Sequence, residues 1–97
     1  MTKLLNETRQ KALAEASANG YTDVVKRLLK DLMVDPSDLD NCALRCASEN
    51  GYTEIVKLLL KDPRVDPSDE DNYAIRCASE NGYTEIVNLL LKSFRRL

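Results

Sequence analysis

The sequence lacks histidine altogether, and its 97 residues include only three cysteines, three glycines and three prolines. Without histidine, the chain has neither the commonest metal ligand nor the side chain that most often exchanges protons near neutral pH. No apolar run approaches the roughly 20 residues that a membrane-spanning helix needs, and the polar start MTKLLNETRQK does not fit a secretory signal. We therefore expect no metal or cofactor site, no membrane contact, and a cytoplasmic location, with the nucleus also open.

A surplus of basic charge is also absent. The chain carries 14 Lys and Arg against 16 Asp and Glu, a net charge of −2, so it has no positive field that would attract nucleic acid. The charge is unevenly spread, because residues 40–70 hold four basic and seven acidic groups, a net charge of −3. We expect no nucleic-acid partner.

What the sequence does have is a repeated phrase. The twelve residues RCASENGYTEIV occupy positions 45–56 and again 76–87, and the looser copy AEASANGYTDVV occupies 14–25. The copies are offset by 31 residues, and each carries a glycine at the same point. Self-similarity at a fixed period of this length is the signature of a protein built from stacked structural repeats.

Each copy is expected to form two helices joined by a turn at its glycine, since glycine adopts positive φ at little cost. Apolar residues recur at helical spacing on both sides of the turn, and prolines interrupt the pattern between copies. The expected helices span about 3–18, 23–31, 41–49, 54–61, 72–80 and 85–95. The sequence thus predicts an all-α solenoid of three stacked helix-turn-helix repeats in a single domain, 1–97. The repeats are repeat 1 (1–39), repeat 2 (40–70) and repeat 3 (71–97).

Local details of this arrangement are also predicted. Thr22 or its neighbour is expected to cap the second helix, and Asp40 or Asn41 the third, because short polar side chains satisfy the free amides of a helix start. Val34 is expected to anchor the first connector between repeats, as its one clear apolar residue.

The three cysteines have no suitable disulfide partner among themselves. Cys42 and Cys46 lie four residues apart on one expected helix, and Cys46 and Cys77 lie one repeat apart. Neighbouring packed helices sit about 8–10 Å apart, whereas a disulfide needs Cα atoms within about 7 Å. We expect three free thiols and a reducing compartment.

At this level the repeats resemble those of the ankyrin family. In that family a finger-like turn precedes a first helix that opens with TPLH, and a Gly-containing turn leads to a second helix of the type EVVxLLL. Residues 50–60 (NGYTEIVKLLL) and 81–91 (NGYTEIVNLLL) are similar to this turn and second helix, and Ala47 and Ala78 match an alanine that precedes them. The resemblance, over about residues 10–94, implies a non-enzymatic protein-protein interaction module. Such a module presents finger-loop and first-helix side chains on a rigid concave surface.

Two departures from the family pattern affect the finger loops. The TPLH box reads CALR from Cys42 and YAIR from Tyr73, so the histidine that ties the finger loop in the family is gone. We expect Arg45 and Arg76 to replace it by pairing with nearby aspartates. These aspartates are Asp40, Asp69 and Asp71. The 31-residue period is about two shorter than usual and predicts short finger loops; tetratricopeptide repeats, the alternative, have a 34-residue period and an aromatic pattern that does not fit.

The candidate partner-binding surface runs along the finger loops and first helices. Cys42 and Tyr73 are equivalent positions that differ between nearly identical repeats, which marks either a contact surface or drift at exposed positions. An exposed tyrosine suits interface anchoring. The full candidate set is Asp38, Leu39, Asn41, Cys42, Arg45, Asp69, Glu70, Asn72, Tyr73 and Arg76.

The chemistry of the partner is open between two interpretations. Arg45 and Arg76 either meet acidic groups of a partner or are neutralised by aspartates of adjacent fingers. The acidic connector residues either cap turns and helices or receive a basic segment, and their spacing does not match a calcium loop. We expect a protein partner with basic and apolar groups. The alternative is a structural or engineered scaffold with no dedicated partner.

Repeat 3 keeps the sequence of an internal repeat, so its outward side is expected to be apolar. The residues expected there are Ile75, Ile86, Leu90, Phe94 and Leu97. A terminal repeat usually carries a polar outer face. Either Phe94 and Leu97 fold over this side, or the chain is part of a longer array, or copies associate as a weak homodimer through repeat 3.

Overall fold

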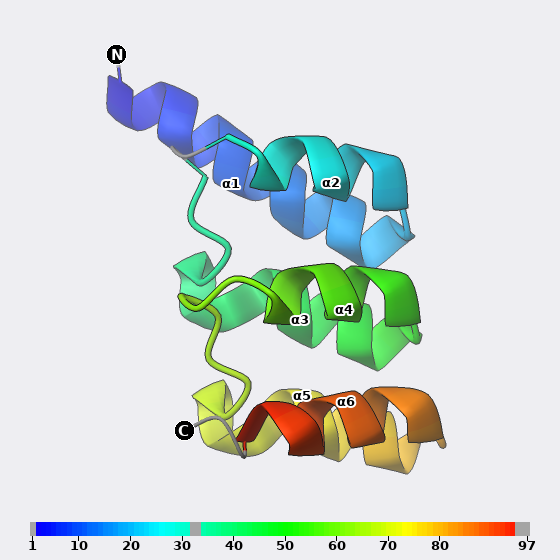
Figure 1. The fold of residues 1–97 in the computed structure, drawn as a ribbon. Coiled ribbons are helices and arrows are strands. Elements are labelled where there is room, and N and C mark those ends of the chain that lie inside the picture. Colours follow the sequence, from blue (N-terminus) through cyan, green and yellow to red (C-terminus); the bar gives the residue numbers. More distant parts are fainter. Residues whose placement is uncertain (1, 32–33, 95–97) are drawn as a thin grey trace.

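The computed structural model describes the backbone of residues 2–31 and 34–94, and the side chains of 9–31, 34–37, 41–68 and 72–94. Over these residues it contains six helices and no strand (Figure 1). The helices are α1 (Thr2–Asn19), α2 (Thr22–Leu29), α3 (Asp38–Asn50), α4 (Thr53–Leu60), α5 (Asp69–Glu80) and α6 (Thr84–Phe94). The predicted all-α solenoid of stacked helix pairs is confirmed.

The helices form two layers. α1, α3 and α5 lie side by side in one layer, and α2, α4 and α6 form the other (Figure 1). Large apolar side chains from both layers fill the space between them. Those with almost no exposed surface are Leu13, Val25, Leu44, Ile55, Val56, Leu59, Ile86 and Leu90. Because burial of one such side chain contributes about 1.5–3 kcal/mol, stacking rather than isolated helix propensity holds the helices in place.

Each helix pair is joined by a tight turn that requires glycine. The turn glycines are Gly20 (φ 78°), Gly51 (φ 81°) and Gly82 (φ 75°). The amide of Tyr52 closes the second turn by donating to the carbonyl of Ala47 at 3.0 Å. The ring of Tyr83, from the next repeat, lies over Gly51, where a Cβ would come within 2.8 Å of it. Glycine is therefore required here both by the left-handed backbone and by the neighbouring repeat.

Thr22 does not cap the second helix; its neighbour Tyr21 takes the N-cap position, but without the expected side-chain bond. Tyr21 and Tyr52 occupy the N-cap positions of α2 and α4 without a side-chain cap bond, and Thr22 is already helical. The backbone closes the start instead, with the amide of Val56 donating to the carbonyl of Tyr52 at 3.1 Å. The N-cap residue is thus a tyrosine that makes no side-chain bond to the helix start.

The first helices of repeats 2 and 3 begin three residues earlier than predicted, at Asp38 and Asp69. In place of a cap, each contains a left-handed asparagine, Asn41 with φ of 58° and Asn72 with φ of 62°, a conformation that asparagine tolerates better than most residues. Asn41 is 3% exposed, and its Oδ1 accepts the amide of Asp66 at 3.0 Å. The side chain thus ties α3 to the connector that follows it.

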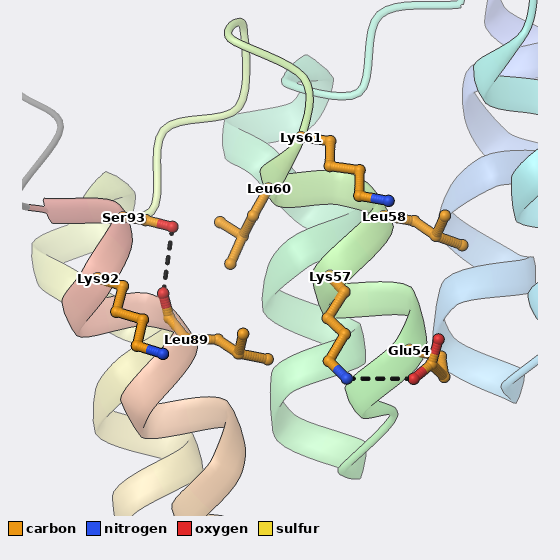
Figure 2. Close-up of a pocket in the computed structure, with 8 residues that line it drawn as sticks. All are labelled: Glu54, Lys57, Leu58, Leu60, Lys61, Leu89, Lys92 and Ser93. Carbon is orange, nitrogen blue, oxygen red and sulfur yellow. Dashed lines mark hydrogen bonds and ion pairs between the residues drawn. The ribbon is translucent and has the colours of Figure 1, made fainter.

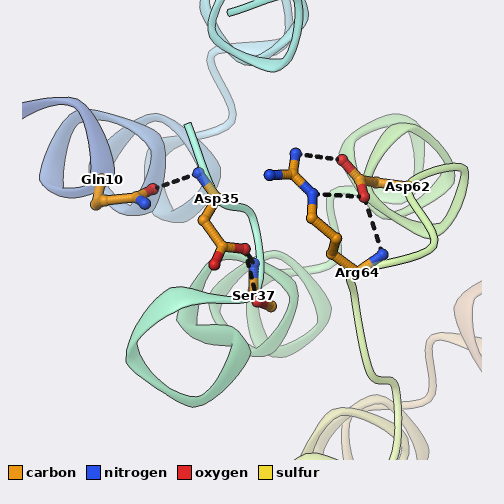
Figure 3. A network of polar contacts seen from close by, with 5 residues as sticks. All are labelled: Gln10, Asp35, Ser37, Asp62 and Arg64. Carbon is orange, nitrogen blue, oxygen red and sulfur yellow. Dashed lines mark hydrogen bonds and ion pairs between the residues drawn. The ribbon is translucent and has the colours of Figure 1, made fainter. Parts of the chain in front are cut away.

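The same tie recurs one repeat earlier. Gln10 Oε1 accepts the amide of Asp35 at 3.1 Å, and Asp35 Oδ1 accepts both the amide of Ser37 at 2.9 Å and its hydroxyl at 2.6 Å (Figure 3). Asp66 and Ser68 repeat this turn with the same distances, 2.9 and 2.6 Å. Two carboxylates of the acidic connectors therefore hold turns together, as one of the two interpretations expected.

The connectors are also held by an apolar anchor and an ion pair. The predicted anchor Val34 is fully buried, and its equivalent Val65 is 8% exposed. Arg64 Nη2 lies 2.8 Å from Asp62 Oδ2 (Figure 3), and this bond lowers the pKa of the Asp62 carboxyl. The described parts of the connectors are therefore fixed to the stack.

The outward side of repeat 3 differs from the prediction. Ile86 and Leu90, expected on that side, have no exposed surface, whereas Leu91 is 46% exposed. The other expected residues are half-buried (Ile75 and Phe94) or outside the described residues (Leu97). Helical spacing identifies an apolar stripe, but the stripe of α6 faces the interior and the preceding repeat.

Candidate interaction surface

Tyr73, near the start of α5, is held between two arginines. The guanidinium carbon of Arg45, on α3, lies 5.4 Å from the ring centroid, and that of Arg76, on α5, lies 5.9 Å from it. Each such contact stabilises by about 0.5–1 kcal/mol at an exposed site. Arg45 and Arg76 are equivalent positions of adjacent repeats, so the ring joins repeats 2 and 3 across the first-helix layer.

Glu49 completes this cluster. It accepts a hydrogen bond at Oε2 from Tyr73 Oη at 3.3 Å, and its carbonyl accepts one from Asn81 Nδ2, also at 3.3 Å. The pKa of Tyr73 is raised to about 12, first by a hydrogen bond with Cys77 and then by the charges of Cys77 and Glu49. The phenol therefore remains a protonated donor at neutral pH.

A pair of thiols lies on α3 beside the cluster. Cys42 Sγ and Cys46 Sγ are 3.6 Å apart, and all three cysteines carry free thiols. Burial raises the pKa of Cys46 to about 11, and the hydrogen bond and charge of Cys42 add to the effect. Because the thiolate is the reactive form, Cys46 is a weak nucleophile at neutral pH.

The ten candidate residues have different environments in the structure. Tyr73 lies between Arg45 and Arg76, and Asn72, beside Tyr73 in the chain, is exposed. The prediction that Asn41 contacts a partner is wrong, because its side chain is buried and bonded to the connector. Several side chains lie outside the described residues, so their roles and their pairing with the arginines stay predictions. They are Asp38, Leu39, Asp40, Asp69, Glu70 and Asp71.

Sequence reasoning did not find Glu49. It follows Arg45 by four residues, which places the two on one face of α3. However, repeat 3 carries the same residue at Glu80, so variation between repeats did not distinguish it. Only the approach of the Tyr73 hydroxyl from the next repeat marks this glutamate as part of the cluster.

A shallow groove of about 260 Å³ opens between the second helices α4 and α6 (Figure 2). Its lining consists of Glu54, Lys57, Leu58, Leu60, Lys61, Leu89, Lys92 and Ser93. Lys57 Nζ lies 3.3 Å from Glu54 Oε1 and 3.5 Å from Glu85 Oε1. Two carboxylates thus balance the central lysine, and the groove is the seam between repeats 2 and 3.

Two kinds of site are absent from the described part of the chain. It holds no group of three or more His, Cys, Asp or Glu side chains placed to bind a metal ion. Nor does any described helix combine the length and the apolar character needed to cross a bilayer.

Helix pairs that repeat every 31 residues and stack in two layers define a helical solenoid, a class of protein that acts through its surface. A family model described as ankyrin repeats in three copies matches residues 13–96. The chain therefore belongs to the ankyrin repeat family, whose members are generally protein-protein interaction modules and typically not enzymes. A comparison with curated proteins finds no match.

Proposed function

We propose that this ankyrin repeat domain binds a protein partner through the Tyr73 cluster. We use that name for Arg45, Glu49, Tyr73, Arg76 and Cys77. The observation that carries the proposal is the position of the ring, flanked by two guanidinium groups and hydrogen-bonded through its hydroxyl. Tyrosine and arginine are enriched among the residues that dominate binding energy at interfaces. Because these side chains already order one another, binding loses little side-chain entropy.

The partner segment that we propose combines an apolar group with basic residues. The apolar group packs on the exposed part of the Tyr73 ring. Its basic residues face Glu49 and the acidic stretch of residues 40–70, whose net charge is −3. Complementary charge of this kind contributes more to specificity and association rate than to affinity.

A random peptide library selected on the immobilised domain tests this function. We expect enriched peptides to combine Lys or Arg with an aromatic or aliphatic residue, and Tyr73→Ala to weaken their binding by about tenfold or more. Tyr21→Ala is the matched control, because Tyr21 is 59% exposed at the turn of repeat 1. Equal binding to wild type and to a helical, folded Tyr73→Ala variant would overturn the proposal.

We also propose that copies of the chain associate weakly through repeat 3. The support is the 46% exposure of Leu91 on a side that terminal repeats usually make polar.

A further inference from the structure

We infer that copies of this chain stack head to tail, so that repeat 1 of one copy docks on the outward side of repeat 3 of another. This inference rests on the proposed association through repeat 3 and names the surface that repeat 3 meets; the variants that test it leave the Tyr73 cluster unchanged. Two faces are involved. The leading face of repeat 1 consists of Lys11, Ala12, Glu15, Tyr21, Val24 and Arg27. The trailing face of repeat 3 consists of Asn72, Ile75, Ser79, Gly82, Val87 and Leu91.

The two faces are the unmatched halves of a contact that the chain makes twice internally. Tyr52 lies over Gly20, and Tyr83 lies over Gly51. At Gly82 the same position is empty, since a Cβ there would meet nothing within 4 Å. The equivalent tyrosine of the leading face, Tyr21, is 59% exposed. A second copy would place Tyr21 on Gly82 by the same geometry.

Other positions show the same relation between the ends and the internal boundaries. Ile55 and Ile86 have no exposed surface, but their equivalent on the leading face, Val24, is 43% exposed. Ser48 is fully buried, but its equivalent on the trailing face, Ser79, is exposed. The apolar and small side chains that internal repeats bury against each other are thus available at the two ends.

One opposite-charge pair forms at the first-helix layer when the observed contacts are moved by one repeat. Tyr73 Oη reaches Glu49 across the boundary between repeats 2 and 3, and the corresponding residues are Lys11 of the leading face and Glu80, next to Ser79 of the trailing face. Each repeat of this chain carries Tyr, Cys or Lys at the Lys11 position. The same move also places Lys11 near Arg76, since the Tyr73 ring lies 5.4 Å from the Arg45 guanidinium, so Lys11 meets one carboxylate and one cation.

A second pair follows from the seam between α4 and α6. Leu89 and Glu54 line the same groove, and moving this relation by one repeat places Arg27 and Glu85 on one groove between the two copies. Asp23 similarly falls beside Asn88, as Glu85 lies beside Lys57 at 3.5 Å. Glu15, in the place of Cys77, falls one helical turn from Lys11 on the same face. Arg27 and Asp23 therefore meet groups that complement them.

This geometry predicts how assembly proceeds. A contact between two different faces leaves one of each face open at the ends of the assembly, so it propagates rather than stopping at two copies. A contact between two trailing faces would instead close as a dimer, and it would leave the Tyr21 ring in water.

Two single variants of the 97-residue chain distinguish these arrangements. Leu91→Glu blocks the trailing face, and Tyr21→Glu blocks the leading face; both side chains are exposed, so the fold should persist. Sedimentation velocity over a concentration series measures assembly, and circular dichroism checks helicity. Lys61→Gln, at an exposed position of the middle repeat, is the matched control.

We expect the wild type and Lys61→Gln to form species that grow beyond dimers as concentration rises. Each blocking variant alone should associate about tenfold or more weakly. An equimolar mixture should form a dimer that does not grow, because only one good face of each variant remains. A wild type that stays monomeric at all concentrations would overturn both the association and this inference. Undiminished dimerisation of Tyr21→Glu, with no dimer gained on mixing, would overturn the head-to-tail arrangement alone.

Discussion

The ring of Tyr52 lies against Gly20 across the boundary between repeats 1 and 2, so that a Cβ at Gly20 would come within 2.7 Å of the ring. The same contact joins Tyr83 to Gly51. A turn glycine and the tyrosine of the following repeat therefore fit together as a unit. The glycine that ends one helix also sets how closely the next repeat approaches.

Two of the turn glycines, Gly51 and Gly82, are expected to respond differently to alanine. Gly82→Ala places a Cβ in open space and incurs only the left-handed backbone penalty, about 1–2 kcal/mol. Gly51→Ala incurs this penalty and also forces a Cβ against Tyr83, which adds about 1–3 kcal/mol. Urea unfolding at low protein concentration measures both values. Equal losses at the two positions would show that the tyrosine yields without cost.

The two left-handed asparagines give a second comparison. Asn41→Ala removes the acceptor of the Asp66 amide, so we expect a loss of about 1–3 kcal/mol from that unsatisfied group in addition to the backbone penalty. Asn72 has nearly the same φ but is exposed, so Asn72→Ala should incur mainly the backbone penalty. Asn41→Asp keeps an acceptor oxygen and should fall between them in urea unfolding. A loss at Asn72 as large as that at Asn41 would contradict the role of the tie.

Replacing Ser48 by alanine should stabilise the fold. Its hydroxyl, like that of Ser17, is buried without a hydrogen-bond partner among the described residues, and an unsatisfied buried polar group is destabilising. We expect Ser48→Ala to raise the free energy of unfolding by about 1 kcal/mol. Ser79→Ala, at the exposed equivalent position, should change it by less than about 0.5 kcal/mol. A clear loss of stability in thermal or urea unfolding of Ser48→Ala would refute this prediction.

Cys46 should react slowly and with an alkaline pH profile. Its pKa is raised from 9.0 to about 11 by burial and by Cys42, so its thiolate fraction at neutral pH is small. We expect alkylation, followed residue by residue with mass spectrometry, to be about tenfold or more slower than for an unstructured thiol. The rate should rise with pH until about 11. Cys42→Ala should move that profile to lower pH, because it removes a contact that favours the protonated thiol; an unchanged profile would exclude the Cys42 contribution.

The same pKa has a consequence for stability. A folded-state pKa raised above the unfolded value means that the folded protein holds its proton more tightly. The resulting contribution of Cys46 is fully present below pH 9 and is lost as pH rises from 9 through about 11. Cys46→Ala should therefore unfold with a weaker pH dependence than wild type in this window.

Most of the architecture could be predicted from local signals. The glycine turns, the prolines and the apolar spacing placed all six helices to within three residues at either end. The errors arise where a contact joins residues that are far apart in the sequence. Asn41 was expected to cap a helix, but its partner Asp66 lies 25 residues away, and only packing brings that amide to it. The prediction that Leu90 faces outward was wrong, because helical spacing identifies the apolar side of a helix but not the neighbour against which that side packs.

The candidate surface was predictable only in part. Tyr73, Arg45 and Arg76 were found because they depart from the family pattern or differ between repeats, yet nothing in the sequence indicated that the two guanidinium groups would flank one ring. Glu49 was missed for the same reason, since its contact with Tyr73 crosses 24 residues.

The sequence by itself determined the period, the turns and the membership of each helix in a repeat, because these depend on backbone preferences and on spacing within a few residues. Only the tertiary structure decided which side chains each helix buries, where the connectors attach, and which tyrosines remain uncovered. Those outcomes depend on contacts between repeats 31 residues apart, and the structure holds no repeat that packs against the leading side of the first or the trailing side of the third.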